Sequence, residues 1–206
     1  MMNNLLKAKH WQIFLFIYGL PLFYQIMLIG STASSSIGSN KLNTETVLKS
    51  LSFNLLFVMI SILLFLYWIW CVGIGLNNKL SKELKIRTGK FKNFLIIIAL
   101  YFIIILLYIW VIMNSWISNN IFHTFTDNGV SLSVFILFFL FNVLVIFCFS
   151  YSCYFVAKTL KTAELQEKGN YSNYVGDFFL IWLFPIGIWF IQPRINNLFS
   201  VLFHIK

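Results

Sequence analysis

Four uninterrupted apolar runs constrain this chain more than any other feature. They cover residues 11–30, 53–76, 94–117 and 132–157, and none of them contains Asp, Glu, Lys, Arg or His. A helix needs about 20 apolar residues to cross the hydrocarbon core of a bilayer, and each run has at least that length. Charged residues make up 10% of the chain, against about 25% in soluble domains. The sequence therefore predicts an all-α, polytopic transmembrane helical bundle.

A fifth apolar stretch at 178–191 is shorter and holds a Pro-Ile-Gly break at 185–187. Fourteen residues in a helix reach about 21 Å, whereas the hydrocarbon core is about 30 Å thick. Extending the stretch to 174–192 gives about 28 Å, and we predict a fifth segment that spans the membrane over this range. The alternative is a re-entrant hairpin turning at the break, which would return Arg194 and Lys206 to the cytoplasm but needs protein to cover its backbone.

Charge between the second and third runs indicates the orientation of the chain. Residues 77–92 contain one acid, Glu83, and six basic residues: Lys79, Lys82, Lys85, Arg87, Lys90 and Lys92. Short loops rich in Lys and Arg remain in the cytoplasm, and the segment 118–131, with no Lys or Arg, suits the outside. We therefore expect a multi-pass protein of the cytoplasmic (inner) membrane with a cytoplasmic N-terminus.

The same six basic residues are candidates for contacts with anionic lipid headgroups. Each Lys or Arg beside an anionic leaflet contributes about 1 kcal/mol to membrane binding. The simpler interpretation is that the loop only fixes the topology. In either case the net charge of +9 is a membrane signal, and no nucleic-acid partner is predicted.

The first run has one competing interpretation, a cleaved signal peptide. Lys7 and Lys9 precede it, and small residues follow it at 31–33. However, the run has 20 residues, longer than the roughly 7 to 15 of a signal-peptide core, and it contains Pro21 and Gln25. We therefore predict a retained first span that is kinked at Pro21, where a backbone donor is missing.

Two segments outside the runs are predicted to be helical, so that residues 1–206 form a single membrane domain. The fourth run continues into good helix formers at 158–168, a predicted cytoplasmic helix ended by Gly169. Residues 195–206 place Asn196, Asn197, Ser200 and His204 opposite apolar residues. This pattern is typical of an amphipathic tail lying at the headgroups, and the alternative is a tail packed on the bundle.

No catalytic residue, cofactor site or metal site is predicted. His10 and His123 fall on opposite sides of the membrane in this topology, and a lone cysteine in an apolar run packs as a small hydrophobe. This applies to Cys71, Cys148 and Cys153. The absence of ionisable groups from the four long runs also argues against ion-coupled transport, which commonly uses a charge at membrane depth.

The region around the break is the candidate block for packing or for a partner. It comprises Trp182, Pro185, Gly187, Trp189, Gln192, Pro193 and Arg194. Together with LLKAKHWQIFLFIYGLP at 5–21, WIWCVGIGLNNKL at 68–80 and YFVAKTLKTAELQ at 154–166, the block FFLIWLFPIGIWFIQPRIN at 178–196 resembles small uncharacterised integral membrane proteins of Bacteroidota, especially flavobacteria. The resemblance covers most of the chain in order, implies an inner-membrane location and transfers no activity.

Three functional hypotheses follow. The first is a non-enzymatic accessory or scaffold subunit of a membrane complex, with the bilayer, anionic lipids and another membrane protein or a second copy as partners. The second is a small channel or membrane-permeabilising oligomer, including a defence-type effector, with Asn54, Asn114 or Asn142 along its path. The third is a lipid-modifying enzyme, for which His10, Asp177 and Arg194 are the candidates near the interfaces.

Overall fold

The computed structural model describes residues 6, 8–38, 44–117, 132–167 and 169–204, and all regular structure in these residues is helical. The elements are α2 (His10–Phe14), the π-helical turn η1 (Leu15–Gly19), α3 (Leu20–Gly38), α4 (Thr44–Lys79), α5 (Gly89–Ile117), α7 (Leu132–Leu165), α8 (Tyr171–Trp182) and α9 (Phe184–His204). The predicted all-α class is confirmed. We call the end of the bundle that carries the 79–92 loop the basic end.

Three of the described helices are long and apolar enough to cross a membrane, which is consistent with the predicted membrane class. They are Leu51–Lys79 in α4, Gly89–Ile112 in α5 and Ile136–Leu165 in α7. The pair His10–Gly19 and Pro21–Ser31, bent by 40°, is a fourth if it is counted as one span. The prediction of five spanning segments is therefore wrong, because 174–192 does not form a single span.

The bend in the first span lies where the sequence predicts a kink. Pro21 supplies no backbone N–H, and the chain before it adopts the π-helical turn η1. The bend brings α2 against α9, while η1 and α3 pack on α4. The first span thus contacts the bundle on two different helices.

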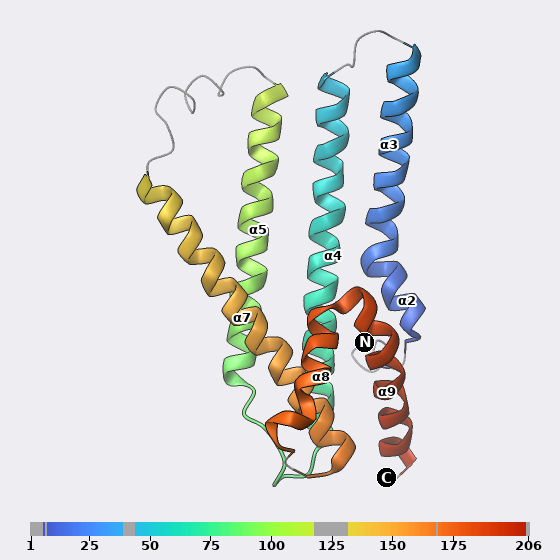
Figure 1. Ribbon diagram of the computed structural model, residues 1–206, viewed down its shortest axis with the longest axis vertical. Coiled ribbons are helices and arrows are strands. Elements are labelled where there is room, and N and C mark those ends of the chain that lie inside the picture. Colours follow the sequence, from blue (N-terminus) through green and yellow to red (C-terminus); the bar gives the residue numbers. More distant parts are fainter. Residues whose placement is uncertain (1–5, 7, 39–43, 118–131, 168, 205–206) are drawn as a thin grey trace.

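Helix α4 is central and contacts η1, α3, α5 and α7 (Figure 1). Most buried side chains lie in its second half, from Leu66 to Leu76, and in the parts of α5, α7, α8 and α9 that surround it. Close packing here requires Gly73, where a Cβ would come within 2.7 Å of the Phe91 ring. Phe91 in turn stacks on Phe155 of α7, with 4.3 Å between ring centroids.

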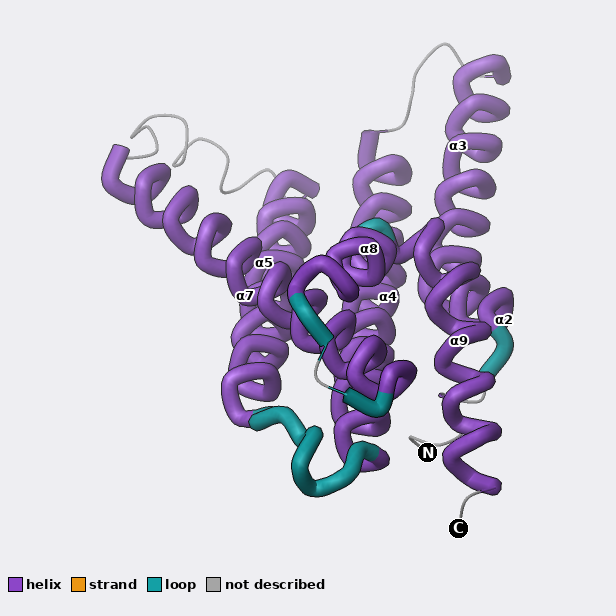
Figure 2. The backbone as a smooth tube through the Cα atoms, turned by 60° about the horizontal axis from the view of Figure 1, so that its bottom comes forward, coloured by secondary structure: helices purple, strands orange, loops and turns teal. Residues whose placement is uncertain are grey.

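Helices α8 and α9 form a hairpin that enters the bundle and returns to the basic end (Figures 1 and 2). The Phe184 ring, at the turn, packs on Phe65 and Trp68 of α4 at centroid distances of 4.4 and 4.9 Å. These α4 residues precede Lys79 by 14 and 11 positions, or about 21 and 17 Å along the helix. The turn therefore lies beside the middle of the candidate span Leu51–Lys79. The segment reverses direction there, as the hairpin alternative describes, and does not continue as the single predicted helix.

The Pro-Ile-Gly motif builds this turn. Helix α8 ends at Trp182, and the carbonyl of the next residue, Leu183, accepts hydrogen bonds from the N–H groups of Ile186 (3.0 Å) and Gly187 (2.9 Å). Pro185 fits the first turn of α9 because it needs no acceptor for an N–H. At Gly187 any Cβ would overlap the carbonyl oxygen of Leu180, so the two arms approach this closely only with glycine. The break thus falls at Leu183, two residues before the predicted position.

Both segments predicted beyond the apolar runs are continuations of longer helices. Helix α7 runs on to Leu165, and Gln166 follows in the left-handed conformation with φ of 54°. The segment 195–204 is the second half of α9, and its Ile195 and Phe199 are buried in the core. The described part of the tail is therefore packed on the bundle. Lys168 and residues 205–206 lie outside the described residues.

Candidate functional site

A charged clamp joins the two arms of the hairpin to the end of α7. We define it as Arg194, Asp177, Glu164 and Lys161. Arg194 Nε donates to Glu164 Oε1 at 2.7 Å and Nη2 donates to Glu164 Oε2 at 2.8 Å. On its other edge Nη1 donates to Asp177 Oδ1 at 2.5 Å and Nη2 to Asp177 Oδ2 at 2.9 Å. Four of the five guanidinium N–H groups are used, in two bidentate pairs.

The clamp is partly buried and its charges balance. The Asp177 side chain is 7% exposed, Glu164 21% and Arg194 31%. Lys161 Nζ lies 3.1 Å from Glu164 Oε2 and supplies the second cation for two carboxylates. Hydrogen bonds to Asp177, and then those to Glu164, hold the pKa of Arg194 well above its usual range. Arg194 therefore remains charged and stabilises a carboxylate that would be costly to bury alone.

A glutamine anchor, which begins two residues before Arg194 on α9, holds the start of the chain. We define it as Gln192, Asn196, Trp68 and the backbone of Leu6 and Ala8. The wholly buried Gln192 accepts a hydrogen bond from Trp68 Nε1 at 3.0 Å and donates to the carbonyls of Ala8 (3.1 Å) and Leu6 (3.3 Å). Asn196 Nδ2 also donates to the Ala8 carbonyl, at 3.2 Å. The anchor ties α9 to α4 and to the segment before α2.

Together, the clamp and the anchor act as structural locks. In the described residues every buried side-chain nitrogen and oxygen has a hydrogen-bond partner. Both clamp carboxylates are engaged by cations, so neither is presented to a cavity as a base. The arrangement fixes the hairpin against three other parts of the chain, and this is the role its geometry supports.

The structure brings the predicted packing block together as the hairpin itself. Pro185 and Gly187 form the turn, Gln192 is the anchor and Arg194 is the clamp. Trp182 packs on Phe149 with 5.3 Å between ring centroids, and Trp189 packs on His10 at 4.6 Å. Pro193 lies inside α9 between the anchor and the clamp.

The six predicted lipid-contact residues are spread around the basic end. Lys82, Lys85, Arg87 and Lys90 are exposed, and Lys79 and Lys92 are partly buried. Lys92 Nζ lies 5.8 Å from the centroid of the Trp70 ring, which favours a cation–π contact. The loop itself is held by Asn77, whose amide makes two 2.9 Å hydrogen bonds with the backbone of Ile86.

The described candidate residues of the channel and enzyme hypotheses are buried or in contact with other side chains of the chain. Asp177 and Arg194 bind each other, while His10 packs on Trp189. Asn142 accepts a hydrogen bond from the Tyr101 hydroxyl at 2.7 Å and donates to the Phe138 carbonyl at 2.8 Å, and Asn54 is buried. The side chain of Asn114, together with His123 and Asp127, lies outside what the structure describes.

Sequence reasoning missed the pairing of Asp177, Glu164 and Arg194. A signal was present: Asp177 lies eight residues before Pro185 and Arg194 nine residues after it. If the chain reverses at the break, opposite charges at matched distances from it face each other. This signal has meaning only for the hairpin, which the sequence analysis did not prefer.

Comparison with known proteins identified no relative. No family model, curated protein or solved structure matches the chain. The function is therefore argued from the geometry alone.

Proposed function

We propose that this protein is a non-enzymatic accessory subunit of a complex in the cytoplasmic membrane, with its basic end in the cytoplasm. One observation carries the proposal, the bare outer side of the re-entrant turn. Phe184 covers the turn on the α4 side, but Leu183 and Ile186 are 55% and 62% exposed. A chain reversal at membrane depth is tolerated where protein buries it, so we infer that a transmembrane helix of another protein covers this side.

The exposed side of the hairpin turn carries large apolar side chains from both arms. Phe179, Leu183, Ile186 and Phe190 are all largely exposed and follow one another at intervals of four, three and four residues. Phe179 and Leu183 lie one turn apart at the end of α8, and Ile186 and Phe190 lie one turn apart near the start of α9. Aromatic side chains such as these two phenylalanines contribute strongly to binding at interfaces. We call these four residues the hairpin face.

Rigidity of the hairpin supports a scaffolding role. The clamp connects α9 to α7 and α8, and the anchor connects α9 to α4. A surface that is already fixed loses little conformational freedom when a partner binds, which favours stable association. The charged residues that an enzyme hypothesis needs are engaged in this support instead of facing a substrate.

Site-specific photo-crosslinking in cells tests the proposal. A photoreactive amino acid at Leu183 or Ile186 is expected to give an adduct with another integral membrane protein. That protein should also co-purify with the unmodified chain in mild detergent. Phe139 on α7 and Phe23 on α3 are matched controls, because both are similarly exposed and apolar.

The other outcomes contradict the proposal in distinguishable ways. The proposed partner protein would be contradicted by equal yields of adduct from the hairpin and control positions. It would also be contradicted if only lipid adducts formed and the protein purified as a lone monomer. A ladder of self-adducts together with dye leakage from liposomes would favour the permeabilising oligomer. Among the described side chains no contact favours that alternative, since Asn142 is held by Tyr101 and Phe138.

A further inference from the structure

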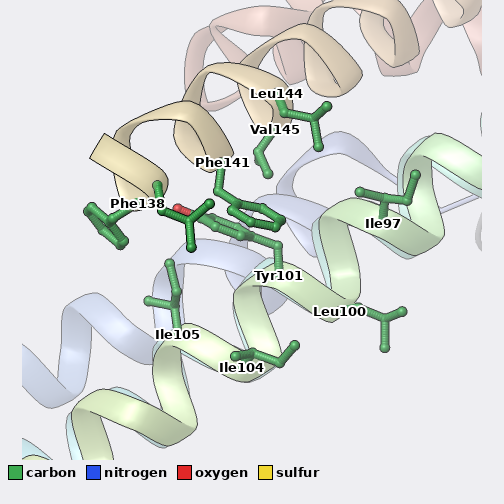
Figure 3. Close-up of a pocket in the computed structure, with 10 residues that line it drawn as sticks. Ile97, Leu100, Tyr101, Ile104, Ile105, Phe138, Phe141, Leu144 and Val145 are labelled. Carbon is green, nitrogen blue, oxygen red and sulfur yellow. The ribbon is translucent and has the colours of Figure 1, made fainter. Parts of the chain in front are cut away.

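Helices α5 and α7 cross near the basic end and then diverge, leaving a cavity of about 480 Å³ between them (Figure 3). At the crossing, the Phe94 ring contacts Tyr151 and Phe147, with centroid distances of 5.0 and 6.2 Å. The volume lies within the range of about 300 to 1,000 Å³ that is typical of ligand sites. The crossing bounds the cavity on the side of the basic end, because Phe94 precedes Ile97 on α5 and Phe147 and Tyr151 follow Val145 on α7.

The walls of the cavity select a hydrocarbon ligand. Ile97, Tyr101 and Ile105 line it from α5, and Phe138, Phe141 and Val145 line it from α7 (Figure 3). Of the described lining residues, Tyr101 alone has a polar side chain, and its hydroxyl already donates to Asn142 at 2.7 Å. A ligand inside the cavity thus meets apolar atoms on both sides.

The cavity is elongated along the two helices. It follows α5 from Ile97 to Ile105 and α7 from Leu137 to Val145, and eight residues of helix span about 12 Å. An extended segment of a single acyl chain fits a cavity of this length.

On both α5 and α7, the row of residues that includes the cavity lining continues at seven-residue spacing to a lysine near the basic end. On α5, Lys90, Ile97 and Ile104 are spaced by seven residues, and on α7 the same spacing relates Lys158 to Tyr151 and Leu144. Residues at this spacing share one helix face, with a drift of about 20° per heptad. Lys90 is exposed and lies about 10 Å from Ile97 along α5, on the side of the basic end. Lys158 Nζ lies 5.8 Å from the centroid of the Tyr154 ring. Lys90 also follows directly on the N-terminus of α5, which itself favours an anion.

We propose that this cavity binds an acyl chain of an anionic phospholipid whose phosphate group lies at Lys90 and Lys158. The apolar cavity would bind the acyl chain, and the two lysines would bind the negatively charged headgroup. A neutral lipid would use only the cavity, and inorganic phosphate would use only the lysines. This lipid site is separate from the hairpin face and does not depend on the proposed subunit role.

Native mass spectrometry of the full chain tests the headgroup. The protein in mild detergent is mixed with equal amounts of phosphatidylglycerol and phosphatidylcholine that carry the same acyl chains. The wild type is expected to retain phosphatidylglycerol preferentially. Combining Lys90→Gln with Lys158→Gln should weaken this binding about fivefold for each charge removed. The control pair Lys9→Gln with Lys49→Gln, which belongs neither to the basic loop nor to α5 and α7, should change it less than twofold.

Two further arms test the chain and separate a lipid from free phosphate. Phosphatidylglycerol with a diazirine on its acyl chain should label peptides that contain 97–105 and 137–145 in the wild-type protein, so that no variant needs to fold. Millimolar inorganic phosphate should not displace the lipid. Equal retention of both lipids, equal effects of the two lysine pairs, displacement by phosphate, or labelling spread evenly over α3 would each overturn the proposal.

Discussion

Arg194 on α9 and Asp177 on α8 bind each other across the re-entrant hairpin, with Arg194 Nη2 2.9 Å from Asp177 Oδ2. The carboxylate is 7% exposed, and the guanidinium, 31% exposed, also binds Glu164 on α7. The pair therefore holds both arms of the hairpin at one level and fixes them to a spanning helix. Removing this pair should therefore destabilise the packing of the basic end.

Arg194→Met should destabilise the protein by about 2 to 3 kcal/mol, because it leaves the Asp177 carboxylate buried without its cation. This loss of stability lies at or just below the lower end of the range known for breaking a buried ion pair, because Arg194 is partly exposed. The thermal unfolding midpoint in mild detergent is the measurement. Arg87→Met, which removes an exposed arginine of the basic loop, should change stability by no more than about 0.5 kcal/mol.

A double variant separates the lost ion pair from a general packing defect. Asp177→Asn combined with Arg194→Met removes the orphaned charge, so part of the stability lost in the single variant should return. If the double variant is as unstable as the sum of the single variants, the two residues are not coupled. The clamp would then have no structural role.

Gln192→Leu should loosen the start of the chain. The variant removes the acceptor of the buried Trp68 indole and the donors to the Ala8 and Leu6 carbonyls, at a cost of about 1 to 3 kcal/mol. Hydrogen–deuterium exchange in residues 6–14 should accelerate. Asn197→Leu, at an exposed position of the same helix, is the control and should leave this exchange unchanged. Equal protection in both variants would show that the anchor does not hold the segment.

Helices α4, α5 and α7 were predictable because hydrophobic length is a local property of the sequence. The runs 53–76, 94–117 and 132–157 lie inside α4, α5 and α7, and all three helices extend beyond their runs. The polar extensions are helical where they continue an established helix, and hydropathy gives no information about them. The predicted kink at Pro21 was also local, since one missing N–H causes it.

The hairpin was not predictable in the same way, because hydropathy measures the length of a segment and not its direction. The reversal at Leu183 depends on Phe184 packing between Phe65 and Trp68, more than 100 residues earlier in the chain. The clamp depends on the reversal in turn, since it joins Asp177 and Arg194 only when the arms are antiparallel. Because the direction of the chain after Leu183 was predicted wrongly, both the hairpin and the charged clamp were missed.

Gly187→Ala should prevent the hairpin from closing. A Cβ at this position overlaps the Leu180 carbonyl oxygen, a backbone atom that cannot move without opening the turn. The expected loss is about 3 kcal/mol or more, measured by thermal unfolding in detergent. Gly176→Ala is a matched control in the same hairpin, because a Cβ there meets nothing within 4 Å. The control should be neutral or slightly stabilising, as alanine favours helix over glycine by about 1 kcal/mol. Equal behaviour of the two variants would contradict the close approach of the arms.

Cysteine labelling should place the C-terminal half of α9 on the same side of the membrane as the basic loop. Single cysteines are introduced as Asn197→Cys on α9, Lys82→Cys in the loop and Asn119→Cys between α5 and α7. Cys71, Cys148 and Cys153 are buried, so background labelling by a membrane-impermeant maleimide should be low. A re-entrant hairpin predicts that positions 197 and 82 react from one side and position 119 from the other. A spanning segment would pair 197 with 119 instead. Because intact cells and inverted vesicles expose opposite faces, the same labelling also tests whether the basic end is cytoplasmic, as its excess of Lys and Arg predicts.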